Sequence, residues 1–133
     1  MHVFHAHIPA GRFSSEKKRA LGNALNQSLV QGLGIPEGDR FIVISEHGDD
    51  ELFIHPTFMD MKRGPDAMII TVIIGAHRPL EDKIKLFAAI NRLVVDATGV
   101  SPDDIFIALI PAPIENFSFG RGLAQLAEGA PQW

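Results

Sequence analysis

The chain has 133 residues, which fits one domain, and its 46% hydrophobic and 21% charged residues are typical of an ordinary soluble globular protein. The absence of cysteine excludes a disulfide framework, thiolate metal sites and a cysteine nucleophile, and the net charge of −4 without a dense Lys/Arg run argues against nucleic-acid binding. No apolar run reaches membrane-spanning length and the N-terminus lacks the layout of a secretory signal, so a cytoplasmic location is expected.

Residues 2–45 are expected to form a strand, a helix and a second strand. The apolar run at 3–8 predicts the first strand, and Ser14 or Ser15 can cap the helix that follows. Gly34 stands where a glycine ends a helix, and the apolar run at 41–44 predicts the second strand after a short acidic turn. The helix is indicated by small or apolar residues at helical spacing, namely Leu21, Ala24, Leu25, Ser28 and Leu29.

A connector at residues 46–66 is rich in Asp, Gly and Pro and holds one short apolar stretch at 52–54. A segment of that length is expected to carry a short strand or a functional loop. Residues 67–110 then repeat the first pattern, with strands at 68–74 and 105–110 around a helix. Pro79 with Glu81 and Asp82 suits the first turn of this helix, and Gly99 suits its end. The remaining residues, 111–133, form an aromatic tail with a loose end.

The two units match each other in sequence. Residues 2–45 align with residues 67–110 without a gap, at the constant offset of 65 residues that separates Asp39 from Asp104. The ungapped register preserves both the helix stops and the acidic turns, which indicates a duplication. The identical pairs are Ile8/Ile73, Glu16/Glu81, Lys18/Lys83, Leu21/Leu86, Ala24/Ala89, Asn26/Asn91, Val30/Val95, Gly34/Gly99, Asp39/Asp104, Phe41/Phe106 and Ile42/Ile107.

The repeat predicts the architecture of the chain. Two strands that flank a helix are expected to pair in parallel through a right-handed crossover. We therefore expect a single domain over residues 1–133 of the α/β (α+β) class, a tandem β-α-β repeat with a four-stranded sheet and two helices on one face. The segments 41–44 and 69–74 are apolar on both sides, so the other face also needs cover. Sister subunits would supply that cover most simply, which predicts a homo-oligomer.

Two local motifs accompany the repeat: Gly-Ile-Pro-Glu-Gly-Asp-Arg-Phe at 34–41 and Asn-Phe-Ser-Phe-Gly-Arg-Gly at 116–122. Together they resemble the tautomerase superfamily over nearly the whole chain, in particular its malonate semialdehyde decarboxylase-like and cis-3-chloroacrylic acid dehalogenase-like branches. Members commonly carry Trp-Ser-Phe-Gly-x-Gly at the second motif, where this chain has Phe117 in place of the Trp. The resemblance implies a homotrimer with active sites near subunit boundaries, and chemistry on small enols or 2-oxo acids without a metal or an organic cofactor.

The hallmark of that superfamily is an amino-terminal proline, whose secondary amine acts as general base or acid. The matching position here is His2, and Pro9 lies too far along the chain. A bulky His after Met1 should hinder removal of Met1, so Met1 is expected to remain. His2 shares a strand face with residues 4, 6 and 8 and is expected to point inward. Its imidazole titrates near neutrality, so either His2 or the Met1 α-amine could move the proton, and the alternative is a His that only packs.

The resemblance also suggests roles for Asp39 and Arg78. Asp39 corresponds to the acid that helps to activate a water or the substrate in some members, although Asp104 shows that an Asp at this position can simply serve the turn. Arg78 stands just after the third strand, where members hold arginines that grip the substrate carboxylate through two parallel hydrogen bonds. The alternative for Arg78 is a solvated residue at the helix entry, and His77 is a weaker neighbouring candidate.

The tail contains the other pocket residues that the resemblance implies. Phe117, Phe119 and Leu126 match the apolar wall that keeps water from the reacting group, with plain core or interface packing as the alternative. Arg121 either closes the pocket or pairs across the trimer, and the sequence does not choose between the two. These residues complete the predicted substrate site.

Two functions remain open on sequence alone. The first is a tautomerase-type isomerase, or a related decarboxylase or hydratase, that acts on a small carboxylate-bearing enol or 2-oxo acid; the retained Asp39 and Arg78 favour it. The second is a trimeric binding protein that has lost the N-terminal catalyst, and the missing proline favours it. We favour the enzyme. Neither function involves a membrane, and no metal site is predicted, because His5 and His7 alternate on one strand face without a third ligand.

Overall fold

A computed structural model describes residues 1–129, so the last four residues of the tail, including most of its expected loose end, lie outside the described part. The regular elements follow the order strand, helix, strand twice over, which confirms the two β-α-β units. The strands are β1 (His2–Pro9), β2 (Ile42–His47), β3 (Met68–Gly75) and β4 (Ile105–Ala112), and the helices are α1 (Ser15–Leu33) and α2 (Leu80–Thr98).

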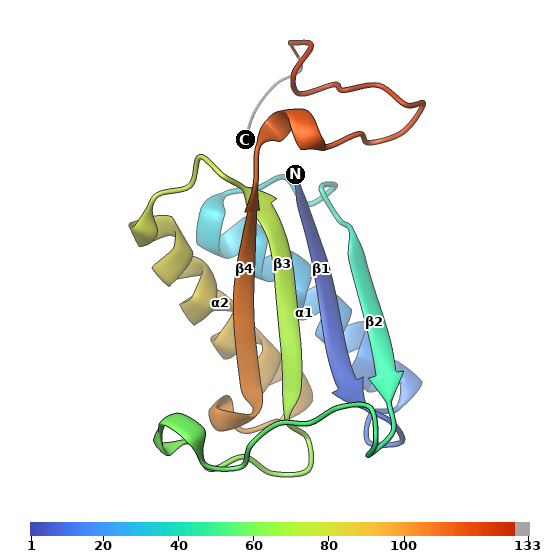
Figure 1. The fold of residues 1–133 in the computed structure, drawn as a ribbon, viewed down its shortest axis with the longest axis vertical. Helices are drawn as coiled ribbons and strands as arrows, with labels where there is room; N and C mark the ends of the chain where they lie inside the picture. Colours follow the sequence, from blue (N-terminus) through green and yellow to red (C-terminus); the bar gives the residue numbers. More distant parts are fainter. Residues whose placement is uncertain (130–133) are drawn as a thin grey trace.

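The four strands form one sheet in the order β2-β1-β3-β4 (Figure 1). β1 pairs in parallel with β2 and β3 pairs in parallel with β4, as expected for strands that flank a helix. The two units meet where β1 pairs antiparallel with β3, with His2 opposite Ile74 and His7 opposite Ile69. As a result, the N-terminus and the tail after β4 lie at one end of the sheet, and the connector between β2 and β3 lies at the opposite end (Figure 1).

Both helices pack on the same face of the sheet, and the core lies between these two layers (Figure 1). The two helices also approach each other closely, since a Cβ at Gly32 would lie only 3.2 Å from the Cβ of Ala89. Full burial of one large aliphatic or aromatic side chain contributes about 1.5–3 kcal/mol, so this layer supplies most of the driving force for folding. The buried strand residues are Phe4, Ala6, Ile8, Met68, Ile70, Val72 and Ile74, and the helices add Leu21, Leu25, Leu29, Leu86, Ile90 and Val94.

The helix ends follow the predicted signals closely. Ser14 caps α1 by accepting a hydrogen bond from the Lys17 amide at 3.1 Å. Gly34 and Gly99 adopt left-handed backbone conformations, with φ of 68° and 76°, and end the two helices as predicted. The expectation that Pro79 lies in the first turn of α2 is off by one residue: its extended backbone (ψ 167°) makes it the N-cap, and the helix begins at Leu80.

Of the two alternatives for the connector, the structure forms no short strand, and β2 departs from its predicted bounds. After β2 ends at His47, residues 48–66 of the connector, all described, form no strand, and their regular element is a single 3-10 turn, Phe58–Asp60. β2 begins one residue later than expected and continues through Ser45, Glu46 and His47, whose polar side chains concealed the continuation. Within residues 1–129, neither helix is long and apolar enough to cross a membrane.

The face of the sheet opposite the helices carries no helix from the described part of the chain. Its apolar residues Val43, Phe106 and Ile110 are 50%, 49% and 48% exposed. Apolar surface of this extent on a sheet face marks an interaction surface more often than a free one. This helix-free face is the one for which the sequence predicts cover by sister subunits.

Candidate functional site

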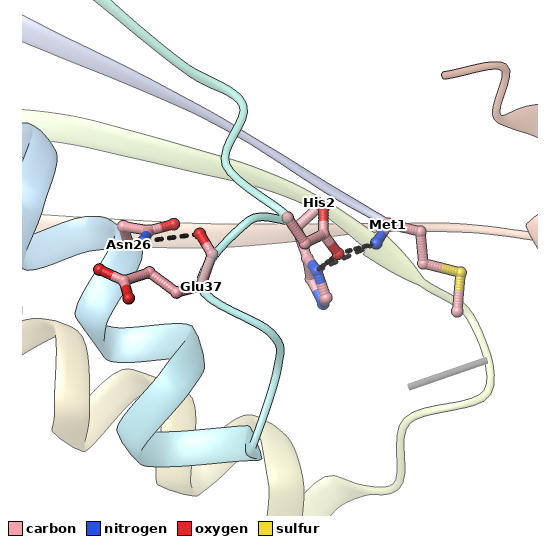
Figure 2. A network of polar contacts seen from close by, with 5 residues as sticks. Met1, His2, Asn26 and Glu37 are labelled. Atoms are coloured by element: carbon pink, nitrogen blue, oxygen red, sulfur yellow. Dashed lines mark hydrogen bonds and ion pairs between the residues drawn. The ribbon is translucent and has the colours of Figure 1, made fainter. Parts of the chain in front are cut away.

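A buried polar cluster at the start of β1 brings together Met1, His2 and Asp39 (Figure 2). The amino group of Met1 donates a hydrogen bond to Asp39 Oδ2, and His2 Nδ1 lies 3.3 Å from the same oxygen. The Met1 nitrogen and His2 Nδ1 are also 3.3 Å apart. All three residues are buried, and polar contacts are stronger in such surroundings than in water. The inward orientation expected for His2 is therefore observed.

Asp39 reaches this cluster because of the way the chain leaves α1. The buried side chain of Ile35 anchors the segment after the helix, and the amide of Asp39 then donates to the carbonyl of Pro36 at 3.0 Å, which closes a tight turn. The Phe4 amide donates to the Phe41 carbonyl at 2.9 Å as β2 begins its parallel pairing with β1. Parallel pairing places the start of β2, and the turn before it, beside the first residues of β1.

The surroundings fix the protonation states of His2 and Asp39. Burial lowers the pKa of His2 below the ordinary value; the hydrogen bond with Asp39 opposes this only in part, and the positive charges of the Met1 amino group and Arg78 add to the lowering. For Asp39, burial acts to raise the carboxyl pKa, but hydrogen bonds from His2 and the Met1 amino group outweigh it, so the pKa is lowered. At neutral pH the cluster therefore pairs a neutral imidazole with an ionised carboxylate.

Two buried polar atoms of the cluster lack a hydrogen-bond partner in residues 1–129. They are His2 Nε2 and Asp39 Oδ1. Buried polar atoms are normally paired, and an unpaired one calls for an explanation such as a bound water, an ion or a catalytic role. The cluster can therefore contact a ligand through these two atoms.

A cavity of about 390 Å³ opens beside Asp39. The rings of Phe41 and Phe119 form part of its wall, with their centroids 5.7 Å apart, and Leu126 adds a buried apolar side chain. This volume is within the range of small-molecule sites, which combine apolar walls with a few placed polar groups. The complete lining is Pro36, Gly38, Asp39, Phe41, Phe119, Gln125 and Leu126.

The side chain of Gln125 holds the tail in place beside this cavity by two hydrogen bonds to the tail backbone. Its Oε1 accepts the Phe119 amide and its Nε2 donates to the Gly120 carbonyl, each at 3.0 Å. Phe117 is partly buried and Arg121 is exposed, and neither lines the cavity. Arg121 also has a left-handed backbone, with φ of 61°, which is uncommon for a residue other than glycine. Of the four predicted tail residues, the cavity includes Phe119 and Leu126.

Arg78 and His77 lie just after β3, near the cluster rather than on the cavity wall. Arg78 Nη1 donates to Asp82 Oδ2 at 3.3 Å, and the Arg78 side chain is only 11% exposed. The alternative of a solvated arginine at the helix entry therefore does not fit Arg78. His77 approaches the Met1 side chain at Gly75, where a Cβ would lie 2.7 Å from Met1 Cε and 2.9 Å from His77 Cε1. Glycine at position 75 therefore lets the Met1 side chain pack beside His77.

His5 and His7 lie on the helix-free face, away from the cluster. His5 Nε2 is 2.7 Å from Ser45 Oγ, and His7 Nδ1 is 2.8 Å from His47 Nε2. The rings of His5 and His7 stack with centroids 3.9 Å apart. Within residues 1–129, no group of three or more His, Cys, Asp or Glu side chains is arranged to hold a metal ion. These histidines are therefore a feature of the sheet face and not of the candidate site.

The sequence matches a family described as tautomerase enzyme over residues 39–120, and a second family of the same description over residues 5–60. The chain belongs to the tautomerase superfamily. The probable tautomerase YusQ of Bacillus subtilis (strain 168) is 30% identical over 92% of this chain and 95% of YusQ. FG41 malonate semialdehyde decarboxylase inhibited by 3-bromopropiolate is 32% identical, with a TM-score of 0.88 over 95% of each chain. A fused 4-OT symmetric trimer shares the fold, with a TM-score of 0.80 and 24% identity over 96% of this chain and 98% of that chain.

Sequence reasoning missed several residues at this tautomerase-superfamily site, including Pro36 and Gly38 on the cavity wall. Phe41 lines the cavity, and its place two residues after Asp39 in the motif at 34–41 could have indicated it. Asn26 contacts the turn that carries Asp39. Its place as a polar residue on the apolar side of a helix could have indicated a specific hydrogen-bonding role. Gln125 also lines the cavity, but it lies in a segment without a periodic pattern, and nothing in the sequence marks it.

Proposed function

We propose that this chain is an enzyme that moves a proton on a small carboxylate-bearing enol or 2-oxo acid held in the cavity beside Asp39. The observation that carries the proposal is the meeting of the Met1 amino group and His2 on one oxygen of Asp39, at the wall of an apolar cavity. The similarity to a malonate semialdehyde decarboxylase and to a probable tautomerase supports small-acid substrates and proton transfer.

The proposed chemistry follows from the protonation states. In ketonisation a base takes the enol hydroxyl proton, the C=O bond forms, and the former C=C electron pair takes up a proton at carbon. His2 is neutral at pH 7 because burial lowers its pKa, so it can accept that proton and return one to carbon. The ionised Asp39 stabilises the positive charge that develops on the imidazole. The Met1 amino group, on the same Asp39 oxygen, is the alternative base.

The remaining candidate residues are assigned to binding. Arg78 does not line the cavity, but its charge acts on His2, so we assign it to a substrate carboxylate that extends from the cavity toward the cluster. A guanidinium can offer that carboxylate two parallel hydrogen bonds, and His77 lies beside Arg78. Phe119 and Leu126 exclude water from the reacting group, which strengthens every electrostatic contact inside the cavity.

The proposed assembly is a homotrimer. The exposed apolar residues of the helix-free face support it, as does the similarity to a fused 4-OT protein that forms a symmetric trimer. Phe117 and Arg121 do not line the cavity of their own chain, and we assign them to the boundary with a neighbouring subunit. Multi-angle light scattering at micromolar concentration tests this assembly, and a stable monomer would contradict it.

The proposed proton transfer is tested by measuring the ketonisation of phenylenolpyruvate and 2-hydroxymuconate. The intact mass of the purified protein establishes whether Met1 is its first residue. If His2 is the base, His2→Ala abolishes turnover, and turnover of the parent protein falls only at a pH below the ordinary His pKa, because burial lowers the pKa of His2. If the Met1 amine is the base, His2→Ala retains turnover, while acetylation of the terminal amine removes it.

A second function, a trimeric protein that binds such acids without turnover, is favoured by one observation. The Met1 amino group already forms an ion pair with Asp39, so it is engaged in a contact within the protein. Binding of a small dicarboxylate without ketonisation of either substrate would support this function. His2→Pro then becomes the decisive variant: gained turnover shows that the rest of the site is intact, and no gain in a folded trimer with a free Pro terminus shows that the assignments of Asp39 and Arg78 are wrong.

A further inference from the structure

Asn26 has a polar side chain on the side of α1 that faces the hydrophobic core. It lies on the core side of α1, is 1% exposed, and is followed by the buried Leu29 one turn later. The other buried polar side chains of the two helices, Ser28 and Thr98, donate to a carbonyl of their own helix, at 2.6 and 2.7 Å. Asn26 instead reaches out of its helix: its Nδ2 donates to the backbone carbonyl of Glu37 at 3.2 Å (Figure 2). A buried amide needs such a partner, because leaving it unpaired costs about 1–3 kcal/mol.

Glu37 lies within the turn that presents Asp39. The turn is closed by the hydrogen bond from the Asp39 amide to the Pro36 carbonyl, so Glu37 lies between its two ends. Pro36, Gly38 and Asp39 all line the cavity. Any shift of the Glu37 carbonyl therefore moves both the carboxylate of the cluster and one wall of the cavity.

The second unit shows that this turn forms without such a tether. Asn91 holds the matching position on α2, but it is only partly buried and its side chain makes no hydrogen bond within the described residues. The turn before β4 is instead supported from within, since Ser101 Oγ accepts the Asp103 amide at 3.2 Å and the Asp104 amide donates to the Ser101 carbonyl at 3.0 Å. A bond from the helix is thus not a requirement of the fold at this position.

We propose that Asn26 is a positioning residue: its side chain, through the carbonyl of Glu37, fixes the turn that holds Asp39 against the Met1 amino group and His2. This role rests on the proposed function of the cluster. Asn26 does not touch the cavity and acts only through the backbone of the turn. A displacement of about 1 Å in a catalytic group can cost up to about 100-fold in rate, so a single tether of this kind is enough to matter.

The test compares Asn26→Leu, which keeps the number and branching of the side-chain heavy atoms but removes the donor, with the matched Asn91→Leu. The first readout needs no substrate: the carboxyl 13C resonance of Asp39 is followed against pH by NMR. The hydrogen bonds from His2 and Met1 hold the pKa of Asp39 below its usual range, so loosening the turn raises that pKa in Asn26→Leu and leaves it unchanged in Asn91→Leu. In the phenylenolpyruvate assay, kcat falls about 10- to 100-fold in Asn26→Leu.

Asn26→Gln, which retains an amide donor, should recover part of both effects, and the pair Asn26→Ala and Asn91→Ala repeats the comparison if the leucine variant does not fold. A lower melting temperature with an unchanged Asp39 pKa would overturn the inference, because Asn26 would then serve only the stability of the fold. Absence of turnover in the parent protein would overturn the proposed function instead, while the Asp39 titration would still decide whether Asn26 places the carboxylate.

Discussion

The two acidic turns of the molecule occupy equivalent positions in the two β-α-β units but meet different partners. Asp39, before β2, accepts from the Met1 amino group and contacts His2 beside a cavity. Asp104, before β4, lies at the opposite end of the sheet, where its Oδ1 accepts the backbone amide of Gly64 at 2.8 Å. Both carboxylates are buried, at 8% and 5% exposure.

Comparing the two turns shows which of their features belong to the fold and which make Asp39 a candidate for chemistry. An Asp in this turn is part of the unit, since both copies have it, and burial alone does not distinguish them. The surroundings distinguish them: one carboxylate meets an amino group and an imidazole, and the other completes the hydrogen bonding of the connector. The same residue at the same position is a candidate catalytic group in one unit and a structural group in the other.

The largest expected effect comes from exchanging each acid for its amide. Asp39→Asn should lower kcat/KM for phenylenolpyruvate by about 100- to 1,000-fold, the range for losing a group that stabilises a developing charge. Asp104→Asn should retain turnover but lower the free energy of unfolding by about 1–3 kcal/mol, because its bond to the Gly64 amide is weakened. Steady-state kinetics and urea denaturation measure the two quantities. Equal losses of turnover in both variants would mean that the turns are not functionally distinct.

The next effect concerns the arginines in the two loops that lead from a strand into a helix. Arg78→Ala should weaken binding of a small dicarboxylate by about 10- to 100-fold, because charge-assisted hydrogen bonds contribute about 1.5–3 kcal/mol. Arg12→Ala is the control, because Arg12 Nε pairs with Asp66 at 2.7 Å at the other end of the sheet. Isothermal titration calorimetry measures both variants. A similar loss in each would indicate that overall charge, rather than a specific guanidinium, attracts the ligand.

A smaller effect is expected from pH on the helix-free face, where the half formed by β1 and β2 carries histidines. Burial, together with the charges of His5 and His47, lowers the pKa of His7. The unfolded chain therefore takes up protons at a higher pH than the folded one, so stability is unaffected well above pH 6.5 and falls as the pH drops through and below that value. The hydrogen bond between His7 and His47 is lost when both are protonated.

Urea denaturation and light scattering between pH 8 and pH 5.5 measure this pH effect on stability and on assembly. His7→Gln should flatten the pH dependence. His55→Asn is the control, because Asn can replace the acceptor that His55 Nδ1 offers to the amides of Thr57 and Phe58. A pH dependence that survives His7→Gln would assign it to other groups.

The smallest effect compares the starts of the two helices. Ser14→Ala should lower the free energy of unfolding by about 1 kcal/mol, because it removes the side-chain cap of α1. Pro79→Ala should change it by less, since α2 has no side-chain hydrogen bond at its N-cap. Urea denaturation at pH 7.5 compares the two variants, and a larger loss at Pro79 would show that its fixed backbone, rather than capping, limits α2.

Much of the fold could be predicted because its signals are local. Ser14, Gly34 and Gly99 mark helix ends by backbone chemistry that acts within one turn, and the repeat fixes the order of the elements. The continuation of β2 through Ser45 was missed because pairing with β1, not apolar character, holds it in the sheet. Likewise, the contact of Asn26 with Glu37 arises only once α1 and the following turn have folded against each other.

The connector has a further consequence for the chemistry of the second unit. The group that meets Asp104 is a peptide nitrogen, that of Gly64, and its lone pair is delocalised into the neighbouring carbonyl. Such a nitrogen donates a hydrogen bond but does not take up a proton, whereas an amine at a chain end does. The two acidic turns thus differ in their donors: Asp39 meets an amine, and Asp104 meets a peptide nitrogen that cannot act as a base. A circular permutant that begins in the connector near Gly64 would return an amine to the neighbourhood of Asp104.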